Sequence, residues 1–168
     1  MRQVMTACSD VDEARIGREA SPWWQSLNGK WQLKLWSSPD AVPNTAIKTD
    51  LATTTGWATV AVPGNWTVQK TGDLPHYTNV QMPWKGRPPT LPPTVATAVH
   101  RTTFTVAKNW KDRRTVLHIG GAESVHMVYV NGTFVGYGTD SRLPSEYDIS
   151  AALTSGKNEL AIVVCRFS

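Results

Sequence analysis

Short stretches typical of β-strands recur along the chain. Where apolar and polar residues alternate, every second side chain faces the same side of a sheet, so one face can be buried. Alternation, or enrichment in β-branched residues, predicts strands at 30–36, 57–62, 100–106, 115–119, 125–130 and 133–137. The apolar run at 160–164 predicts a strand buried on both faces. Short helices are predicted near 10–16 and at 150–153, so the pattern indicates an all-β fold.

Turn and breaker residues separate the predicted strands. Asn131-Gly132 lies between two of them and predicts a two-residue hairpin turn, because both residue types tolerate a positive φ. Seven prolines between Pro63 and Pro93 exclude central strands there, so 64–98 is predicted to be a long loop stiffened by proline. Regular short strands separated by turns are typical of an antiparallel sandwich or jelly roll.

The composition is that of one folded domain. The chain has 168 residues, of which 40% are hydrophobic and 18% are charged, a mix typical of globular proteins. No apolar run approaches the roughly 20 residues of a membrane helix, and the first 15 residues lack the apolar core of a signal peptide. We therefore expect a cytoplasmic protein without a membrane partner. Residues 1–25 show no clear period and are predicted to form an extended N-terminal arm, with the domain at 26–168.

The net charge and the cysteines indicate no nucleic-acid partner and no disulfide framework. The formal charge is +4, but apart from KDRR at 111–114 the basic residues are scattered, so no stripe follows a phosphate backbone. Cys8 and Cys165 could pair, yet Cys165 follows an apolar run that predicts a buried thiol.

The histidines and glycines do not match a metal or phosphate motif. His76, His100, His118 and His126 lack the paired spacing of a zinc site. His118 and His126 could face each other on neighbouring strands, but we interpret them as histidines on the surface of a sheet. GYGTD at 136–140 lacks the strand-to-helix context of a phosphate loop and is interpreted as a bend after the hairpin.

A pair of carboxylates could act in glycoside hydrolysis, and five acidic residues are candidates: Asp73, Glu123, Asp140, Glu146 and Asp148. Arg142 lies close enough in sequence to pair with Asp140 or with Glu146. Charge-assisted hydrogen bonds of this kind fasten loops, so we interpret this group as structural.

Aromatic residues outside the predicted strands indicate a binding surface. The chain has eight tryptophans, and several lie in turn-rich contexts: Trp23, Trp24, Trp66 and Trp84. Tryptophan outside a core is common on ligand platforms and at interfaces. HYTNVQMPWKGRPP at 76–89 is predicted to be an irregular loop, and loops of this length are usually either functional or disordered. The residues alone therefore indicate a sugar-binding or interaction module, without a convincing catalytic group.

Several stretches resemble one known family in order and spacing. They are SLNGKW at 26–31, VPGNW at 62–66, HYTNVQMP at 76–83, VNGTFVGYGTDSRLPSEYDIS at 130–150 and NELAIVV at 158–164. They are similar to the N-terminal sugar-binding domain of β-galactosidases of glycoside hydrolase family 2, over residues 21–168. The resemblance implies a jelly-roll β-sandwich of the galactose-binding-domain-like type.

The resemblance also implies a fragment of a larger multidomain enzyme. In the family this domain packs beside an immunoglobulin-like domain and a catalytic (β/α)₈ barrel that holds both catalytic glutamates. The chain alone is therefore expected to be inactive, without a metal or cofactor of its own. Magnesium and sodium are expected in the full-length enzyme, with the sodium-binding aspartate just past the C-terminus. That enzyme is expected to be a homo-oligomeric, retaining β-galactosidase that hydrolyses terminal β-D-galactosides such as lactose.

The resemblance assigns substrate contacts to the 76–83 segment. By this match Asn79 would contact substrate hydroxyls and Val80 would wall the galactose site, because the segment reaches into the mouth of the barrel. The group formed by Asp140, Arg142, Glu146 and Asp148 would fasten the loops after the hairpin, and Glu123 could face the barrel.

Three alternatives stay open. The chain could be a free-standing carbohydrate-binding module whose tryptophans form the platform. The parent could be a glucuronidase or mannosidase of the same family, since fold alone does not set the sugar, although DSRLPSE and TNV favour a galactosidase. Nucleic-acid binding ranks last.

Overall fold

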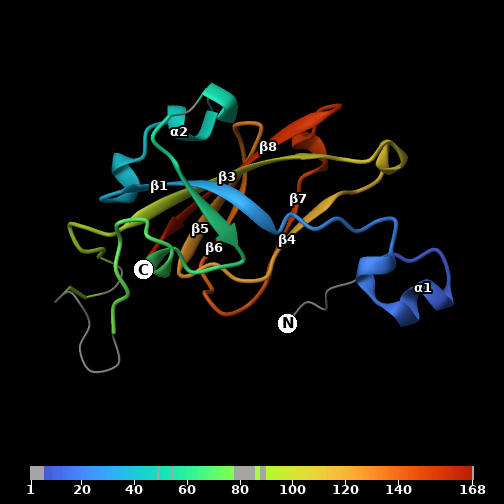
Figure 1. The fold of residues 1–168 in the computed structure, drawn as a ribbon, viewed down its shortest axis with the longest axis horizontal. Coiled ribbons are helices and arrows are strands. Elements are labelled where there is room, and N and C mark those ends of the chain that lie inside the picture. The colour runs from blue at the N-terminus through green and yellow to red at the C-terminus, as the bar shows by residue number, and fades with distance from the viewer. Residues whose placement is uncertain (1–5, 49, 54, 78–85, 88–89, 168) are drawn as a thin grey trace.

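The computed structural model describes residues 6–48, 50–53, 55–77, 86–87 and 90–167. Its strands form an antiparallel six-stranded sheet in the order β2-β1-β3-β8-β5-β6, and a two-stranded sheet, β4-β7 (Figure 1). The strands are β1 Gly29–Trp36, β2 Ala58–Val62, β3 Thr97–Thr105, β4 Val116–Ile119, β5 Val125–Val130, β6 Thr133–Gly138, β7 Ser145–Asp148 and β8 Lys157–Cys165. The predicted all-β jelly-roll sandwich is confirmed.

Helices are short and connect the strands. The α-helices are α1 Val11–Ile16 and α2 Thr45–Lys48, and the 3₁₀ turns are η1 Arg18–Ala20, η2 Pro39–Ala41, η3 Leu51–Thr53, η4 Trp66–Val68, η5 Lys108–Trp110 and η6 Ser150–Ala152. The Asp10 side chain caps α1 by accepting from the Glu13 N–H, and α1 buries no residue. Both predicted short helices are confirmed. Among the described residues, no helix is long and apolar enough to span a membrane.

The main core lies between the two sheets. Side chains from the inner face of the large sheet, such as Trp31, Leu33 and Leu160, pack with Leu117 of β4 and Tyr147 of β7. Each of these side chains is at most 9% exposed. Burying one large apolar side chain contributes about 1.5–3 kcal/mol, so the alternation along the strands supplies much of the stability of the sandwich.

A second, smaller core covers the opposite face of the large sheet. Ile47 of α2 packs there with Val99 of β3 and with Ala161 and Val163 of β8. Strand β8 is therefore buried on both faces, as its uninterrupted apolar run predicts. Cys165 at its end is a buried free thiol, and burial raises the pKa of that thiol.

The predicted hairpin turn is confirmed, and it is tied to two other elements. Asn131 and Gly132 both have positive φ, at 51° and 75°. The Asn131 side chain donates to the Ala152 carbonyl and to Asn158 Oδ1, each at 2.8 Å, and it accepts from the Glu159 N–H at 2.9 Å. The turn thus joins the hairpin to η6 and to β8.

Two interpretations of the sequence were wrong in this region. Residues 145–148 form β7 rather than loop, paired in register with β4. Strand β6 continues to Gly138, which was interpreted as part of a bend after the hairpin, and it also contains Gly136. They are glycines for steric reasons, since a Cβ at Gly136 would come within 2.8 Å of the Tyr147 ring and one at Gly138 within 2.5 Å of the His126 ring.

The interpretation of two histidines on the surface of a sheet also needs correction. His126 of β5 is 1% exposed and lies in the large sheet, whereas His118 of β4 is half-buried and lies in the small sheet. The two are therefore not neighbours on adjacent strands. The outward face expected for His126 is ruled out because Tyr147 covers it from the opposite layer.

Candidate functional site

The two residues predicted to contact substrate, Asn79 and Val80, lie outside the described residues. What the structure describes is the chain that leads to them, up to Tyr77. The contacts of the residues before Tyr77 show how this part of the chain is held.

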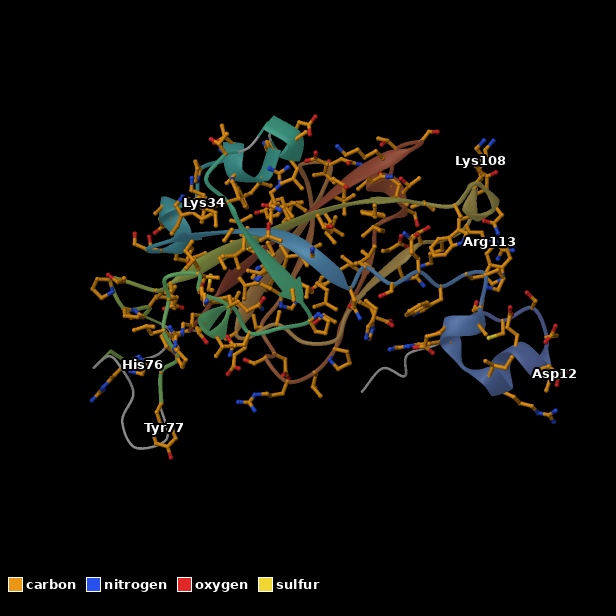
Figure 2. All side chains as sticks on the ribbon, in the orientation of Figure 1. Asp12, Lys34, His76, Tyr77, Lys108 and Arg113 are labelled. Carbon is orange, nitrogen blue, oxygen red and sulfur yellow. The ribbon has the colours of Figure 1, made fainter. Side chains whose placement is uncertain are left out.

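A long groove of about 1540 Å³ runs along the inner face of the large sheet. His76, Arg166 and Phe167 line one end of it, and Trp23 and Arg113 line the other. Figure 2 shows His76 and Tyr77 at one end of the molecule, with Arg113 toward the opposite end, where α1 carries Asp12. The groove therefore links the segment that precedes Asn79 with the N-terminal arm.

Local sequence explains how the first part of the proline-rich region folds. Asn65 caps η4, because its Oδ1 accepts from the Thr67 N–H at 3.1 Å and from the Thr67 hydroxyl at 2.8 Å. The Gln69 side chain accepts from the Ala61 N–H at 2.7 Å and donates to the Ala61 carbonyl at 3.1 Å. Through these bonds η4 is fixed to β2.

Asp73 fastens the next residues to the end of β8. Its Oδ2 accepts from Trp66 Nε1 at 2.7 Å, and its Oδ1 accepts from Arg166 Nη1 at 2.7 Å. The side chains of Asp73 and Arg166 are 17% and 15% exposed, and Trp66 is 8% exposed. A largely desolvated, charge-assisted hydrogen bond of this kind is stronger than one between exposed ions. We call Trp66, Asp73 and Arg166 the anchor.

Beyond the anchor the chain turns outward. The ring of His76 meets the ring of Phe167 edge-on, with centroids 6.4 Å apart, and the Arg166 guanidinium lies 5.2 Å from the centroid of that phenylalanine. Leu74 and Tyr77 are each 75% exposed. The segment therefore leaves the sandwich immediately after a fixed point, presenting apolar and aromatic side chains to its surroundings.

His100 lies beside the anchor on β3. Its ring centroid is 5.7 Å from that of Trp66, and burial lowers the pKa of His100 to about 4. Its Nδ1 has no hydrogen-bond partner in the part of the chain that the structure describes. At neutral pH His100 is therefore an uncharged packing residue rather than a proton carrier.

The Arg142 side chain pairs with Glu123 rather than with Asp140 or Glu146, the two partners considered from the sequence. Asp140 Oδ1 accepts from the backbone N–H groups of Arg142 and Leu143, at 2.9 and 3.2 Å. The Arg142 guanidinium lies 3.5 Å from Glu123, and Glu146 lies 3.6 Å from His118 Nδ1. Each charge thus has a separate partner, because β7 carries Glu146 toward β4.

Asp148 ends β7 and fixes the connection to η6. It accepts from the Ser150 hydroxyl at 2.7 Å and from Arg114 Nε at 2.8 Å. The hydrogen bond from the Ser150 hydroxyl, followed by that from Arg114, lowers the pKa of Asp148 to about 2.

The N-terminal arm is held at the far end of the groove. Arg113 lies over the ring of Trp23, 3.5 Å from its centroid, and Trp110 Nε1 donates to the Pro22 carbonyl at 2.8 Å. Trp23 and Trp110 therefore act at an internal contact, and Trp66 lies in the core. No local pattern predicted these partners, because Trp110 and Pro22 are 88 residues apart.

The residues present do not match a metal site. Within the described ranges no three side chains of histidine, cysteine, aspartate or glutamate gather closely enough to hold an ion.

Comparison with known proteins places this arrangement in a family. The family described as "Glycosyl hydrolases family 2, sugar binding domain" matches residues 24–168. A β-galactosidase of Psychromonas ingrahamii is 40% identical over 156 residues, which are 93% of this chain and 15% of that protein.

Solved structures show the same fold. The β-glucuronidase of Bifidobacterium dentium, complexed with coumarin-3-O-glucuronide, matches with a TM-score of 0.63 at 23% identity, over 83% of this chain and 19% of that one. The Faecalibacterium prausnitzii β-glucuronidase gives 0.62 at 20% identity, over 83% and 20%. The chain thus spans about a fifth or less of each of these relatives. With the family match covering most of its length, the chain belongs to glycosyl hydrolase family 2, as its sugar-binding domain.

Proposed function

We propose that this domain is the N-terminal part of a longer, retaining β-galactosidase. The observation that carries the proposal is the 40% identity to a β-galactosidase over nearly the whole chain. The solved β-glucuronidases, at 17–23% identity, share the fold and do not bear on the sugar. The substrate class is therefore taken from the relative with the higher identity.

In this proposal the domain supplies binding groups and the rest of the longer chain supplies the catalytic acids. Asn79 contacts substrate hydroxyls, because an amide can donate and accept at once, as a sugar hydroxyl does. Val80 forms an apolar wall of the same pocket. The anchor supports this role, since a site residue on a loop needs rigid support close by.

Kinetics of the complete protein test the substrate. Hydrolysis of 4-nitrophenyl β-galactoside is expected to exceed hydrolysis of the matching β-glucuronide, and the 168-residue chain alone is expected to be inactive. Asn79→Ala is expected to lower kcat/KM about three- to tenfold, the effect of losing one neutral hydrogen bond, whereas Asn28→Ala at an exposed site serves as the control. A preference for the glucuronide would overturn the proposal.

A free-standing carbohydrate-binding module is the second candidate. The observation that favours it is the groove, whose lining includes Trp24. Calorimetry of the 168-residue chain with galactose and lactose separates the two functions. A module should bind with at least millimolar affinity, about 4 kcal/mol, whereas a pocket completed by another domain should give almost no heat.

We further propose that the longer enzyme is a cytoplasmic homo-oligomer, with the remainder of its chain as the partner of this domain and with magnesium and sodium bound outside it. EDTA is expected to lower the activity of the complete protein while leaving the circular dichroism of the 168-residue chain unchanged. Light scattering measures the molar mass of the complete protein and therefore the number of its subunits.

A further inference from the structure

We propose that Asp73 is a positioning residue for galactoside binding. The inference rests on the proposed function, in which the residues that follow Tyr77 face the substrate. Asp73 does not touch those residues itself. It acts by fixing the point at which the chain leaves the sandwich.

The geometry singles out Asp73 because each of its carboxylate oxygens holds a different element. Oδ2 accepts a hydrogen bond from the indole N–H of Trp66 in η4. Oδ1 accepts one from the guanidinium of Arg166, which follows β8. Oδ1 also accepts from the N–H of Leu74, at 3.1 Å, so the backbone of the departing segment is held by the same group. One carboxylate therefore joins three parts of the chain, and Arg166 lies 93 residues from Asp73 in the sequence.

The two partners of Asp73 in the anchor, Trp66 and Arg166, are themselves held by further hydrogen bonds. Trp66 is buried, and its carbonyl accepts from the Thr71 hydroxyl at 2.8 Å, which closes the turn between η4 and Asp73. The backbone N–H of Arg166 donates to the Ala96 carbonyl at 3.0 Å, next to β3. The carboxylate is thus held between two rigid supports, whereas Leu74 and Tyr77, just beyond it, are largely exposed. The three hydrogen bonds of Asp73 thus lie at the start of the segment that leads to Tyr77.

Hydrogen exchange of the 168-residue chain tests the anchor directly. Asp73→Asn keeps the size of the side chain but removes its charge, and Trp66→Phe removes the indole donor. The amide of Leu74, which donates to Asp73, is expected to exchange about tenfold faster in both variants, together with the amides of His76 and Tyr77, since a hydrogen bond to a charged group is worth about one such factor. Amides of β3 and β8 should change less. Asp40→Asn, at an exposed position, is the matched control and should change nothing.

Kinetics of the complete protein test the effect on substrate. Losing an interaction that is equally strong in the ground state and the transition state raises KM and leaves kcat unchanged. Asp73→Asn is therefore expected to raise KM for the aryl β-galactoside about tenfold, with kcat per active site within about twofold. A purely structural role would lower the active fraction and leave KM unchanged.

The outcomes separate two kinds of failure. Unchanged exchange at 74–77, an equal rise throughout the strands, or a local rise without a change in KM would each overturn the positioning role. A complete wild-type protein that does not cleave galactosides overturns the proposed function and this role with it, and the exchange data then show whether the anchor itself was correctly identified.

Discussion

The Tyr147 hydroxyl and Nε2 of His126 share a hydrogen bond of 2.7 Å between the two layers of the sandwich. Tyr147 lies in β7 of the small sheet and His126 in β5 of the large one, and their rings are nearly perpendicular, at 89°. Burial lowers the pKa of His126 and raises the pKa of Tyr147. The bond therefore joins two neutral groups at physiological pH, across the interface between the two layers.

Tyr147→Phe is expected to destabilise the domain by about 1–3 kcal/mol, because the buried Nε2 of His126 loses its partner while the ring is kept. Urea unfolding followed by tryptophan fluorescence measures the change. Tyr137→Phe is the matched control, since Tyr137 is 65% exposed, and it should stay within about 0.5 kcal/mol of wild type. Equal stability of the two variants would show that the interlayer bond contributes nothing.

Gly138→Ala is expected to cost about 1–3 kcal/mol by overpacking. Its Cβ would lie 2.5 Å from His126 Cε1 and 2.9 Å from the Tyr147 hydroxyl oxygen, so both rings would have to move. Gly120→Ala is the control, because no atom lies within 4 Å of a Cβ at that position. Thermal unfolding compares the two, and a Gly138→Ala protein as stable as Gly120→Ala would contradict the proposed contact.

The stability of the domain is expected to fall as the pH drops from about 6.5 to about 4. Burial lowers the pKa of His100 from 6.5 to about 4, so below pH 6.5 the unfolded chain binds a proton that the folded chain excludes. Stability from this group is complete above pH 6.5 and is lost on acidification. His126 acts in the same direction.

His100→Phe tests the origin of that slope, since it keeps a ring against Trp66 but cannot take up a proton. Urea midpoints measured between pH 4 and pH 8 should show a shallower dependence in the variant than in wild type. Asp148 does not confuse the result, because its pKa falls from 3.8 in the unfolded chain to about 2 in the folded one, and both values lie below this range. Parallel slopes in the two proteins would assign the effect to other groups.

Arg113→Ala is expected to loosen the N-terminal arm. The variant loses the stacking of the guanidinium on Trp23, a contact worth about 1 kcal/mol, so amides at 18–25 should exchange about fivefold faster. Arg114→Ala is a close control, because the neighbouring Arg114 pairs with Asp148 rather than with the arm. An arm that exchanges equally in both variants would mean that the Trp110 contact holds it alone.

The strands were predictable because their signal is local. The pleat places alternate residues on one face, so burial leaves a two-residue period in the sequence whatever the partners are. That period located strands such as β1, and runs of β-branched or apolar residues located others such as β8, so that seven of the eight strands in the described residues were predicted; the Asn131-Gly132 turn followed from backbone preference alone. Strand β7 was missed because it has four residues, of which only Tyr147 is buried, so no period could emerge.

The sequence by itself determined which apolar residues of the predicted strands face inward and, through its motifs, the family. Only the tertiary structure decided the partners of the polar groups. Asp73 meets Arg166 across 93 residues, and His126 is buried because Tyr147 arrives from the opposite layer. A hydrogen bond depends on where two chain segments meet in space, and no periodicity along the chain records that meeting. The two glycines of β6 show the same limit, because a larger residue there would clash with the rings of Tyr147 and His126 in other strands.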